Sequence, residues 1–245
     1  MKSLLVLVIA FSAALLASLS GGSASALTIP AWLAMGVPLP TAVATDKLAA
    51  ALWTLLGARN YLRGRAVDRR LLAGMLAVGL AGAVLGTMVT VRIDPVALKR
   101  FAGGMILVLI AILLARPRLG AQPGVPRAPR WVLTAGALPL GFYEGMLGSG
   151  NGIVATLLFC WGRGYDVIGA LGHYCVLAFA WCALAAGLYI GHGYHDAALM
   201  LPATVGACSG GWLGSRIASL RGAGFVRGLF AIAGTALGLK LLLGL

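Results

Sequence analysis

Four ionisable side chains lie within apolar stretches of this sequence, and they are the first candidates for chemistry. They are Asp46, Lys47, Glu144 and His173. A charge at the centre of a membrane helix costs at least about 2.5–3.5 kcal/mol, so each such residue is a candidate functional group. Lys47 is a candidate counter-charge for an anion, and the hydroxyl of Thr45 beside it is a candidate donor. Glu144 is the favoured proton carrier, because partial burial of a carboxylate moves its titration towards neutral pH.

Each of these residues also has a simpler interpretation. Asp46 and Lys47 are neighbours and form, in that interpretation, a neutralising pair that only fixes helix packing. Glu144 is then an interfacial carboxylate near a helix end. The simpler interpretation of His173 is a packed histidine whose ring nitrogens are both hydrogen-bonded. The internal repeat described below nevertheless aligns His173 with Asp46.

Two glycine-rich stretches predict breaks in the helices that carry them. The sequence from 141 to 152 reads GFYEGMLGSGNG inside a long apolar run, and the sequence from 20 to 25 reads SGGSAS. Glycine lowers helix stability by about 1 kcal/mol relative to alanine. A broken membrane helix is tolerated where the freed backbone groups face protein or a water-filled cavity. The candidate binding residues of the two breaks are Gly21, Gly22, Ser23, Ser25, Gly148, Gly150, Asn151 and Gly152.

These breaks predict an anion site built from backbone. A helix that restarts after a break presents its N–H groups and the positive end of its dipole, which favour anions. Ser25 and Gly152 occupy equivalent positions at the two restarts. The alternative is close helix packing through the spacing Gly141/Gly145 and Gly148/Gly152, without any site.

The composition defines an integral membrane protein. The 245 residues are 60% hydrophobic and 10% charged, with a mean hydropathy of +0.97, whereas soluble domains carry about 25% charged residues. The net charge of +13 resides mainly in loops between apolar stretches. That distribution indicates membrane topology and anionic lipid headgroups rather than nucleic-acid binding. The lipid bilayer is therefore the expected partner.

The apolar stretches predict an all-α polytopic membrane protein of about eight transmembrane helices, in two repeats of four. The predicted spans are 1–37 with a break, 41–58, 71–91, 98–115, 131–162 with a break, 167–190, 197–215 and 223–244. The expected organisation is a first membrane repeat at 1–115, a basic Pro-rich linker at 116–130 and a second repeat at 131–245. The N-terminal stretch resembles a secretory signal peptide, but the second apolar piece that follows it favours a first membrane helix.

The second half repeats the first. A shift of 127 residues lays Gly21 on Gly148 and Gly79 on Gly206, and a shift of 128 lays Gly82 on Gly210 and Gly86 on Gly214. Four spans in each half would give both halves the same orientation, related by an axis along the membrane normal. A re-entrant piece in each broken stretch would change that parity. With eight plain spans, more basic residues fall on the side of the N-terminus, which predicts cytoplasmic termini.

The doubled pattern resembles the TauE/SafE family of membrane transporters, described as sulfite and organosulfonate exporters or permeases. The matching features are the two glycine-rich breaks, MGVPLPTAVATDKL at 35–48, RIDPVALKRFAG at 92–103 and the long stretch at 213–243. The family's glycine run is usually fuller than here, where Ser23, Ser25 and Asn151 interrupt it. The resemblance implies a secondary transporter for a small sulfur-containing anion, with alternating access in the cytoplasmic membrane.

The alternative function is a membrane-embedded assembly factor or enzyme with no transport role. The sequence contains no HExxH, GxSxG or P-loop motif, so we expect no enzyme, no catalytic residues and no cofactor. The four cysteines have no CxxC spacing, and His192 and His195 have no evident third ligand, so no metal site is expected. The oligomeric state stays open, and a homo-oligomer is compatible with these features.

Overall fold

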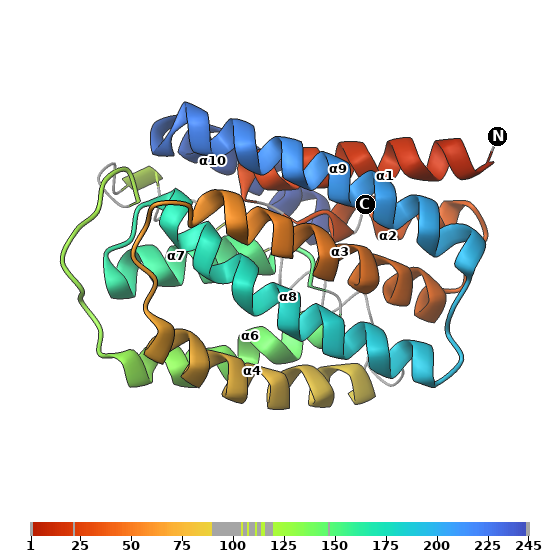
Figure 1. The fold of residues 1–245 in the computed structure, drawn as a ribbon, viewed down its shortest axis with the longest axis horizontal. Coiled ribbons are helices and arrows are strands. Elements are labelled where there is room, and N and C mark those ends of the chain that lie inside the picture. The colour runs from red at the N-terminus through yellow and green to blue at the C-terminus, as the bar shows by residue number, and fades with distance from the viewer. Residues whose placement is uncertain are drawn as a thin grey trace.

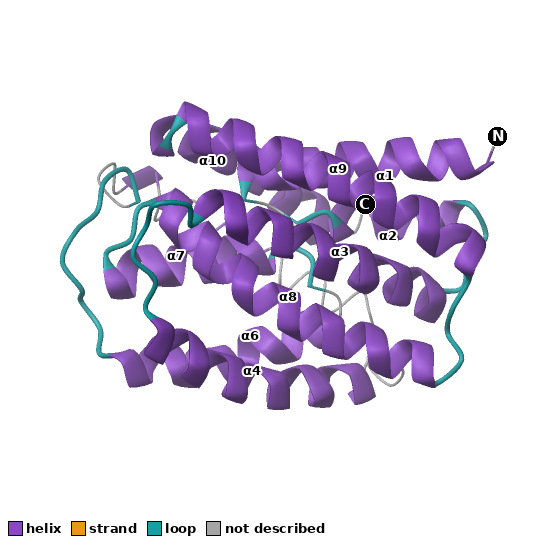
Figure 2. Ribbon diagram, viewed as in Figure 1, coloured by secondary structure: helices purple, strands orange, loops and turns teal. Residues whose placement is uncertain are grey.

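The described part of the protein is entirely helical, and no strand occurs in it (Figure 2). The computed structural model describes residues 2–21, 23–89, 120–146 and 148–243, together with five isolated positions between 104 and 115. The predicted span at 98–115 and the motif at 92–103 therefore lie outside the continuously described residues. The all-α prediction is confirmed, whereas the count of eight spans is not tested.

The described residues contain nine helices (Figure 1). This number exceeds the eight predicted spans because each glycine-rich stretch separates two helices. They are α1 (Lys2–Ser20), α2 (Ser25–Ala34), α3 (Leu39–Tyr61), α4 (Arg69–Val89), α6 (Arg130–Met146), α7 (Asn151–Arg163), α8 (Val167–Gly191), α9 (Ala197–Arg221) and α10 (Ala223–Leu243). Of these, α1, α4, α8 and α9 are long and apolar enough to cross a membrane. The breaks fall where the glycines predicted them.

The first broken stretch is a hairpin rather than a kinked span. After α1 the chain turns through Gly21, whose φ of +63° suits glycine, and α2 then runs back towards the end at which α1 began. Ile29 of α2 packs with Tyr189 and Met200, which lie near the end of α8 and the start of α9. The stretch therefore enters and leaves at one end of the molecule. We call this end the histidine end, since the loop with His192 and His195 lies there.

The second broken stretch forms a hairpin that enters from the opposite end. The last turn of α7 returns to the start of α6, where Gly162 packs tightly against Leu133. The carbonyl of Gly162 also accepts hydrogen bonds from the amides of Arg127 and Ala128, each at 3.0 Å, in the loop before α6. We call this end the arginine end, because it carries the loop 62–68 with Arg63 and Arg65. The two hairpins thus point towards each other from opposite ends.

The two halves run in opposite directions. Helices α3 and α8 occupy equivalent places in the repeat, yet the end of α3 packs against the start of α8: Gly57 lies beside Cys175, and Gly172 beside Leu62. Equivalent helices that are antiparallel require a pseudo-two-fold axis across the helices, in the membrane plane. The expectation of an axis along the membrane normal is wrong, because such an axis would make α3 and α8 parallel.

Glycines on two helices allow the same close contact in both halves. Gly210 of α9 packs against the carbonyl of Phe11 on α1, and Gly82 of α4 packs against the carbonyl of Leu138 on α6. These pairs are equivalent under the shifts of 128 and 127 residues. Within α6, Gly141 and Gly145 likewise touch backbone of α4 at Gly79 and Ala83. The packing interpretation of the glycine-rich stretch therefore holds for its first half, whereas its second half contains the break. The exact domain boundaries stay a prediction.

Candidate functional site

The tips of the two hairpins meet between the two ends of the molecule. The hydroxyl of Ser23 donates a hydrogen bond to the carbonyl oxygen of Gly148 at 3.2 Å and lies 3.0 Å from the hydroxyl of Ser25. Ser25 begins α2, and Asn151 and Gly152 begin α7, so both short helices start at this meeting point. The structure brings the two breaks together, as the repeat suggested. Gly22 lies outside the described residues.

Glycine is needed at the second tip for two reasons. Gly148 and Gly150 have φ values of +69° and +83°, which side chains rarely adopt. A methyl group on Gly148 would also overlap the carboxylate of Glu144 and the ammonium of Lys47. The turn is closed by the amide of Gly148, which donates to the carbonyl of Tyr143 at 2.9 Å. The tip therefore lies directly against a pair of charges.

Lys47 and Glu144 form a buried ion pair at this tip. The Nζ of Lys47 lies 2.8 Å from Oε1 of Glu144, and the two side chains are 0% and 4% exposed. Three further groups donate to the carboxylate: Asn151 Nδ2 at 2.7 Å, Tyr174 Oη at 3.0 Å and Cys182 Sγ at 3.3 Å. This set of donors holds Glu144 as a carboxylate, which argues against Glu144 as the proton carrier in this conformation.

A small closed chamber lies beside this ion pair. Its volume of about 20 Å³ is enough for one water molecule. Its walls include Ala50 and Thr54 of α3 and Ala178 and Cys182 of α8. The chamber therefore lies between these two helices, one from each half. Its remaining lining residues are Ser23, Ala24, Ser25, Trp53, Glu144 and Tyr174.

The sequence did not single out Tyr174 and Cys182. Both belong to the central site, since both donate to Glu144. One signal for them was present, because residues 174, 178 and 182 are spaced four apart and share one face of a helix.

Asp46 does not pair with Lys47, although the two are neighbours in sequence. Its Oδ1 accepts a hydrogen bond from the hydroxyl of Thr28 on α2 at 2.5 Å, while Lys47 points to Glu144. The alternative of a neutralising Asp46–Lys47 pair is therefore wrong. The hydroxyl of Thr45 donates at 2.8 Å to the carbonyl of Thr41 in its own helix. Thr45 thus lines the surroundings of Asp46 and is not aimed at the ion pair.

His173 lies at the arginine end and not at the depth of Asp46. Its ring stacks on Tyr165 with 4.5 Å between centroids. Its Nε2 accepts from the amide of Asp68 at 3.4 Å, so Nδ1 donates to the carbonyl of Gly169 at 2.7 Å. The repeat alignment misplaced His173 because α3 and α8 are antiparallel, so that equivalent residues lie on opposite sides of the centre. His173 is a packed histidine whose two ring nitrogens are both satisfied.

Ion pairs connect the two halves at the arginine end. Asp68 accepts from Arg130 at 2.9 Å and lies 3.5 Å from Arg163, so it holds both legs of the α6–α7 hairpin. Burial raises the pKa of the Asp68 carboxyl, but hydrogen bonds from Arg130 and the Leu71 amide, with the charges of Arg130 and Arg163, lower it further, below its usual value. Arg65 pairs with Asp166 at 2.5 Å nearby.

The structure places several arginines at a different end of the molecule from the one that eight plain spans would give. With eight plain spans, Arg163, Arg216 and Arg221 would lie on the side opposite the loop at 59–70. The structure brings Arg163 to Asp68, and the end of α9 to Asn60, whose side chain donates to Ser215 at 2.8 Å. The basic residues of the described chain therefore concentrate at one end. This end includes Arg59, Arg63, Arg65, Arg69, Arg70, Arg127, Arg130, Arg163, Arg216 and Arg221.

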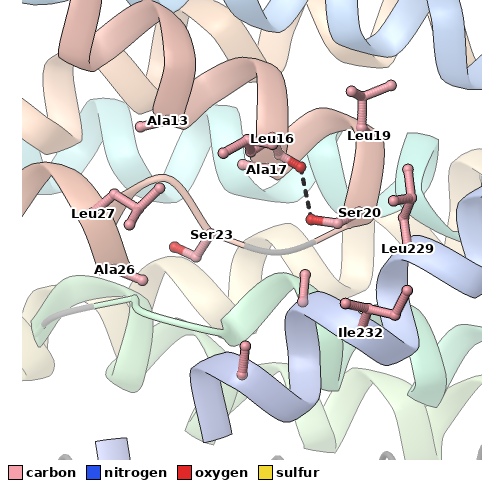
Figure 3. A pocket seen from close by; sticks show the side chains of 12 residues that line it. Ala13, Leu16, Ala17, Leu19, Ser20, Ser23, Ala26, Leu27, Leu229 and Ile232 are labelled. Carbon is pink, nitrogen blue, oxygen red and sulfur yellow. Dashed lines mark hydrogen bonds between the residues drawn. The ribbon is translucent and has the colours of Figure 1, made fainter. Parts of the chain in front are cut away.

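An apolar pocket of about 370 Å³ lies beside the first tip (Figure 3). Leu16 and Leu19 of α1 and Leu229 and Ile232 of α10 line it, together with Ser23 of the tip. No group of three histidine, cysteine or acidic side chains within the described residues could hold a metal ion.

Opposed hairpins that meet at a buried ion pair, inside a bundle of apolar helices, define a multi-pass membrane transporter architecture. The chain matches the family described as "Sulfite exporter TauE/SafE" over residues 6–241, and it belongs to this family. The resemblance seen in the sequence is confirmed. The protein is a membrane transporter of that family.

Curated relatives agree with this assignment. The chain is 29% identical over 236 residues to a "Probable membrane transporter protein ORF9" of Sinorhizobium sp., covering 96% of this chain and 90% of the relative. It is 28% identical over 225 residues to a "Probable membrane transporter protein" of Haemophilus influenzae, covering 91% and 88%. It is also 28% identical over 255 residues to the "Probable membrane transporter protein YfcA" of Escherichia coli K12, covering 99% and 91%. No solved structure matches the chain.

Proposed function

We propose that the protein is a secondary transporter that moves a small sulfur-containing anion, such as sulfite or a sulfonate, across the cell membrane by alternating access. The family description supports the substrate class, and the names of the relatives support transport rather than catalysis. The geometry of the hairpin tips supports an anion.

The single observation that carries this proposal is the convergence of three positive features. The short helices α2 and α7 both begin at the tips, and Lys47 lies directly against Gly148. The start of a helix carries about half a positive charge, and discontinuous transporter helices bind anionic groups there. An anion between the tips would meet both helix starts and would compete with Glu144 for the ammonium of Lys47.

The structure supports a closed state between two open ones. The central chamber of about 20 Å³ accommodates a water but not a sulfite or a sulfonate, so an anion enters only after the tips separate. The α1–α2 hairpin faces the histidine end, and the α6–α7 hairpin faces the arginine end. Movement of each hairpin would open the site to its own end, which is the geometry that alternating access requires.

The arginine end is the proposed cytoplasmic face, since cytoplasmic loops carry the excess of lysine and arginine. The N-terminus and the loop with His192 then lie outside, opposite to the orientation expected from the sequence. The test uses single cysteines at Tyr194 and at Arg63 and a membrane-impermeant maleimide on intact cells. We expect labelling at position 194 and none at 63 until the cells are opened. The reverse pattern would refute this orientation.

Transport is tested in proteoliposomes with the wild-type chain and labelled sulfite, a sulfonate and a neutral solute. We expect saturable flux of at least one anion and none of the neutral solute. Lys47→Met should abolish this flux, whereas Arg59→Met, an exposed position on the same helix, should not. Absence of flux for all sulfur anions tested would favour the assembly-factor alternative.

A further inference from the structure

A second buried polar site lies on the other side of the first hairpin tip, around Asp46. The residue is 3% exposed, and its Oδ1 accepts from Thr28 at 2.5 Å. Its Oδ2 is buried and has no hydrogen-bond partner among the described residues. A buried charged oxygen without a partner is costly, so such an atom points to a missing ligand.

Asp46 lines a chamber of about 10 Å³, close to the volume that one water needs. Trp32 and Trp53 line the same chamber, and their indole N–H groups are also buried without a partner among the described residues. One water that accepts from an indole N–H and donates to Asp46 Oδ2 would satisfy two of these three groups, and a water that accepts from both indoles would satisfy all three.

Asp46 is the sole titratable residue among the described residues that line this chamber. Helices α1 and α9 contribute Ala10, Ala203 and Ala207, and α2 contributes Ala24, Thr28 and Trp32. The charged groups nearest to Asp46 are Lys47 and Glu144, and these two are paired with each other. A proton that arrives at Asp46 therefore changes the charge of this chamber by one unit, and the nearest cation, Lys47, stays paired with Glu144.

We propose that Asp46 is the proton-binding residue that couples anion movement to a proton gradient; this proposal rests on the proposed transport function. A lone pair of Oδ2 takes the proton and forms an O–H bond, and release of the proton restores the carboxylate. The neutral acid can donate to the chamber water, while Oδ1 still accepts from Thr28.

The position of Asp46 explains how its charge acts on the anion site. Thr28, its partner, belongs to α2, the short helix that starts at the first tip. Ala24, Ala50 and Trp53 line both the Asp46 chamber and the chamber beside Glu144. A change of charge at Asp46 thus alters the contact that holds α2 on α3, and through α2 it alters the tip. Proton binding and opening of the α1–α2 hairpin become linked.

The first test compares Asp46→Asn with Asp196→Asn in proteoliposomes. Asp196 caps α9 in an exposed loop, and asparagine caps as well as aspartate, so this control makes the same chemical change without the chamber. We expect Asp46→Asn to keep exchange of labelled sulfite at equal pH. Accumulation driven by a pH gradient should fall by about tenfold or more, the size of an ordinary coupling free energy. Asp196→Asn should match the wild type in both assays.

Accumulation that persists in Asp46→Asn under a pH gradient would overturn the proposal, as would accumulation driven by sodium and indifferent to pH. Loss of both exchange and accumulation would count against a pure coupling role. Failure of the proposed function looks different, since the wild type itself would then exchange no anion.

A second measurement needs neither a substrate nor transport. Infrared difference spectra of the full-length protein between acidic and alkaline buffer report the carbonyl stretch of a buried carboxylic acid. We expect this band in the wild type and in Asp196→Asn, and its loss in Asp46→Asn. A wild-type spectrum without the band, or a band that survives in Asp46→Asn, would refute proton binding at Asp46.

Discussion

The hydroxyl of Ser23 reaches the carbonyl oxygen of Gly148 at 3.2 Å and so links two residues that lie 125 positions apart in the chain. This long hydrogen bond is a direct contact between the two hairpin tips. A neutral hydrogen bond contributes only about 0.5–1.5 kcal/mol, so the tips can separate at modest cost. The strong interaction at the centre is the neighbouring ion pair between Lys47 and Glu144. Opening of the site requires this pair to separate or to exchange partners.

The conformation of the second tip is tested by Gly148→Ala. Alanine in the left-handed region costs about 1–2 kcal/mol, and its methyl group would overlap Glu144 and Lys47. We expect a lower melting temperature in detergent and a loss of anion flux. The matched control is Gly187→Ala in α8, where a methyl group meets no atom and helix propensity improves. Equal melting temperatures for the two variants would contradict the tip geometry.

The ion pair is tested by a double-mutant cycle. Lys47→Met alone leaves the Glu144 carboxylate charged, buried and without its cation, and Glu144→Gln alone leaves the Lys47 ammonium charged, buried and without its anion. Each single change should cost about 3–5 kcal/mol of unfolding free energy. The double variant should recover most of the stability and yet fail to bind sulfite in calorimetry. Costs that simply add would show that the two residues do not interact.

The equivalent glycine contacts predict equal sensitivity in the two halves. Gly82→Val and Gly210→Val each push a branched side chain into a backbone carbonyl of the neighbouring helix. Overpacking costs about 1–3 kcal/mol, and a backbone atom yields less readily than a side chain. We expect similar losses in unfolding free energy for the two variants, measured by denaturant titration. Gly187→Val is the control without a neighbour. A large effect in one half alone would argue against equivalent packing.

The Asp68 ion pairs predict a stability difference that depends on pH. The pKa of Asp68 is lower in the folded protein than its ordinary value of 3.8, so its contribution is present above that value and disappears as pH falls through the folded pKa. Asp68→Asn should therefore lower the melting temperature at neutral pH, by an amount that reflects about 1 kcal/mol or less. In acid below the folded-state pKa of Asp68 the two proteins should converge. A difference that grows in acid would refute this assignment.

The positions of the helix breaks were predictable, because glycines and a buried asparagine are local signals. The hairpin geometry was not, since an apolar stretch of more than thirty residues fits a kinked span as well as a return to the same face. The Lys47–Glu144 pair could not be predicted from the sequence either, because its members lie 97 residues apart and Lys47 has an acidic neighbour at Asp46. His173 was misplaced because the repeat alignment shows which residues are equivalent but not which way each half points.

The antiparallel relation of α3 and α8 has an evolutionary consequence. A gene duplication that yields two oppositely inserted halves requires an ancestral half that entered the membrane in both orientations and paired with its own inverted copy. Such an ancestor needs nearly balanced charges on its two faces. The present chain has abandoned that balance: the α3–α4 loop carries arginines, and the equivalent α8–α9 loop carries His192 and His195 instead.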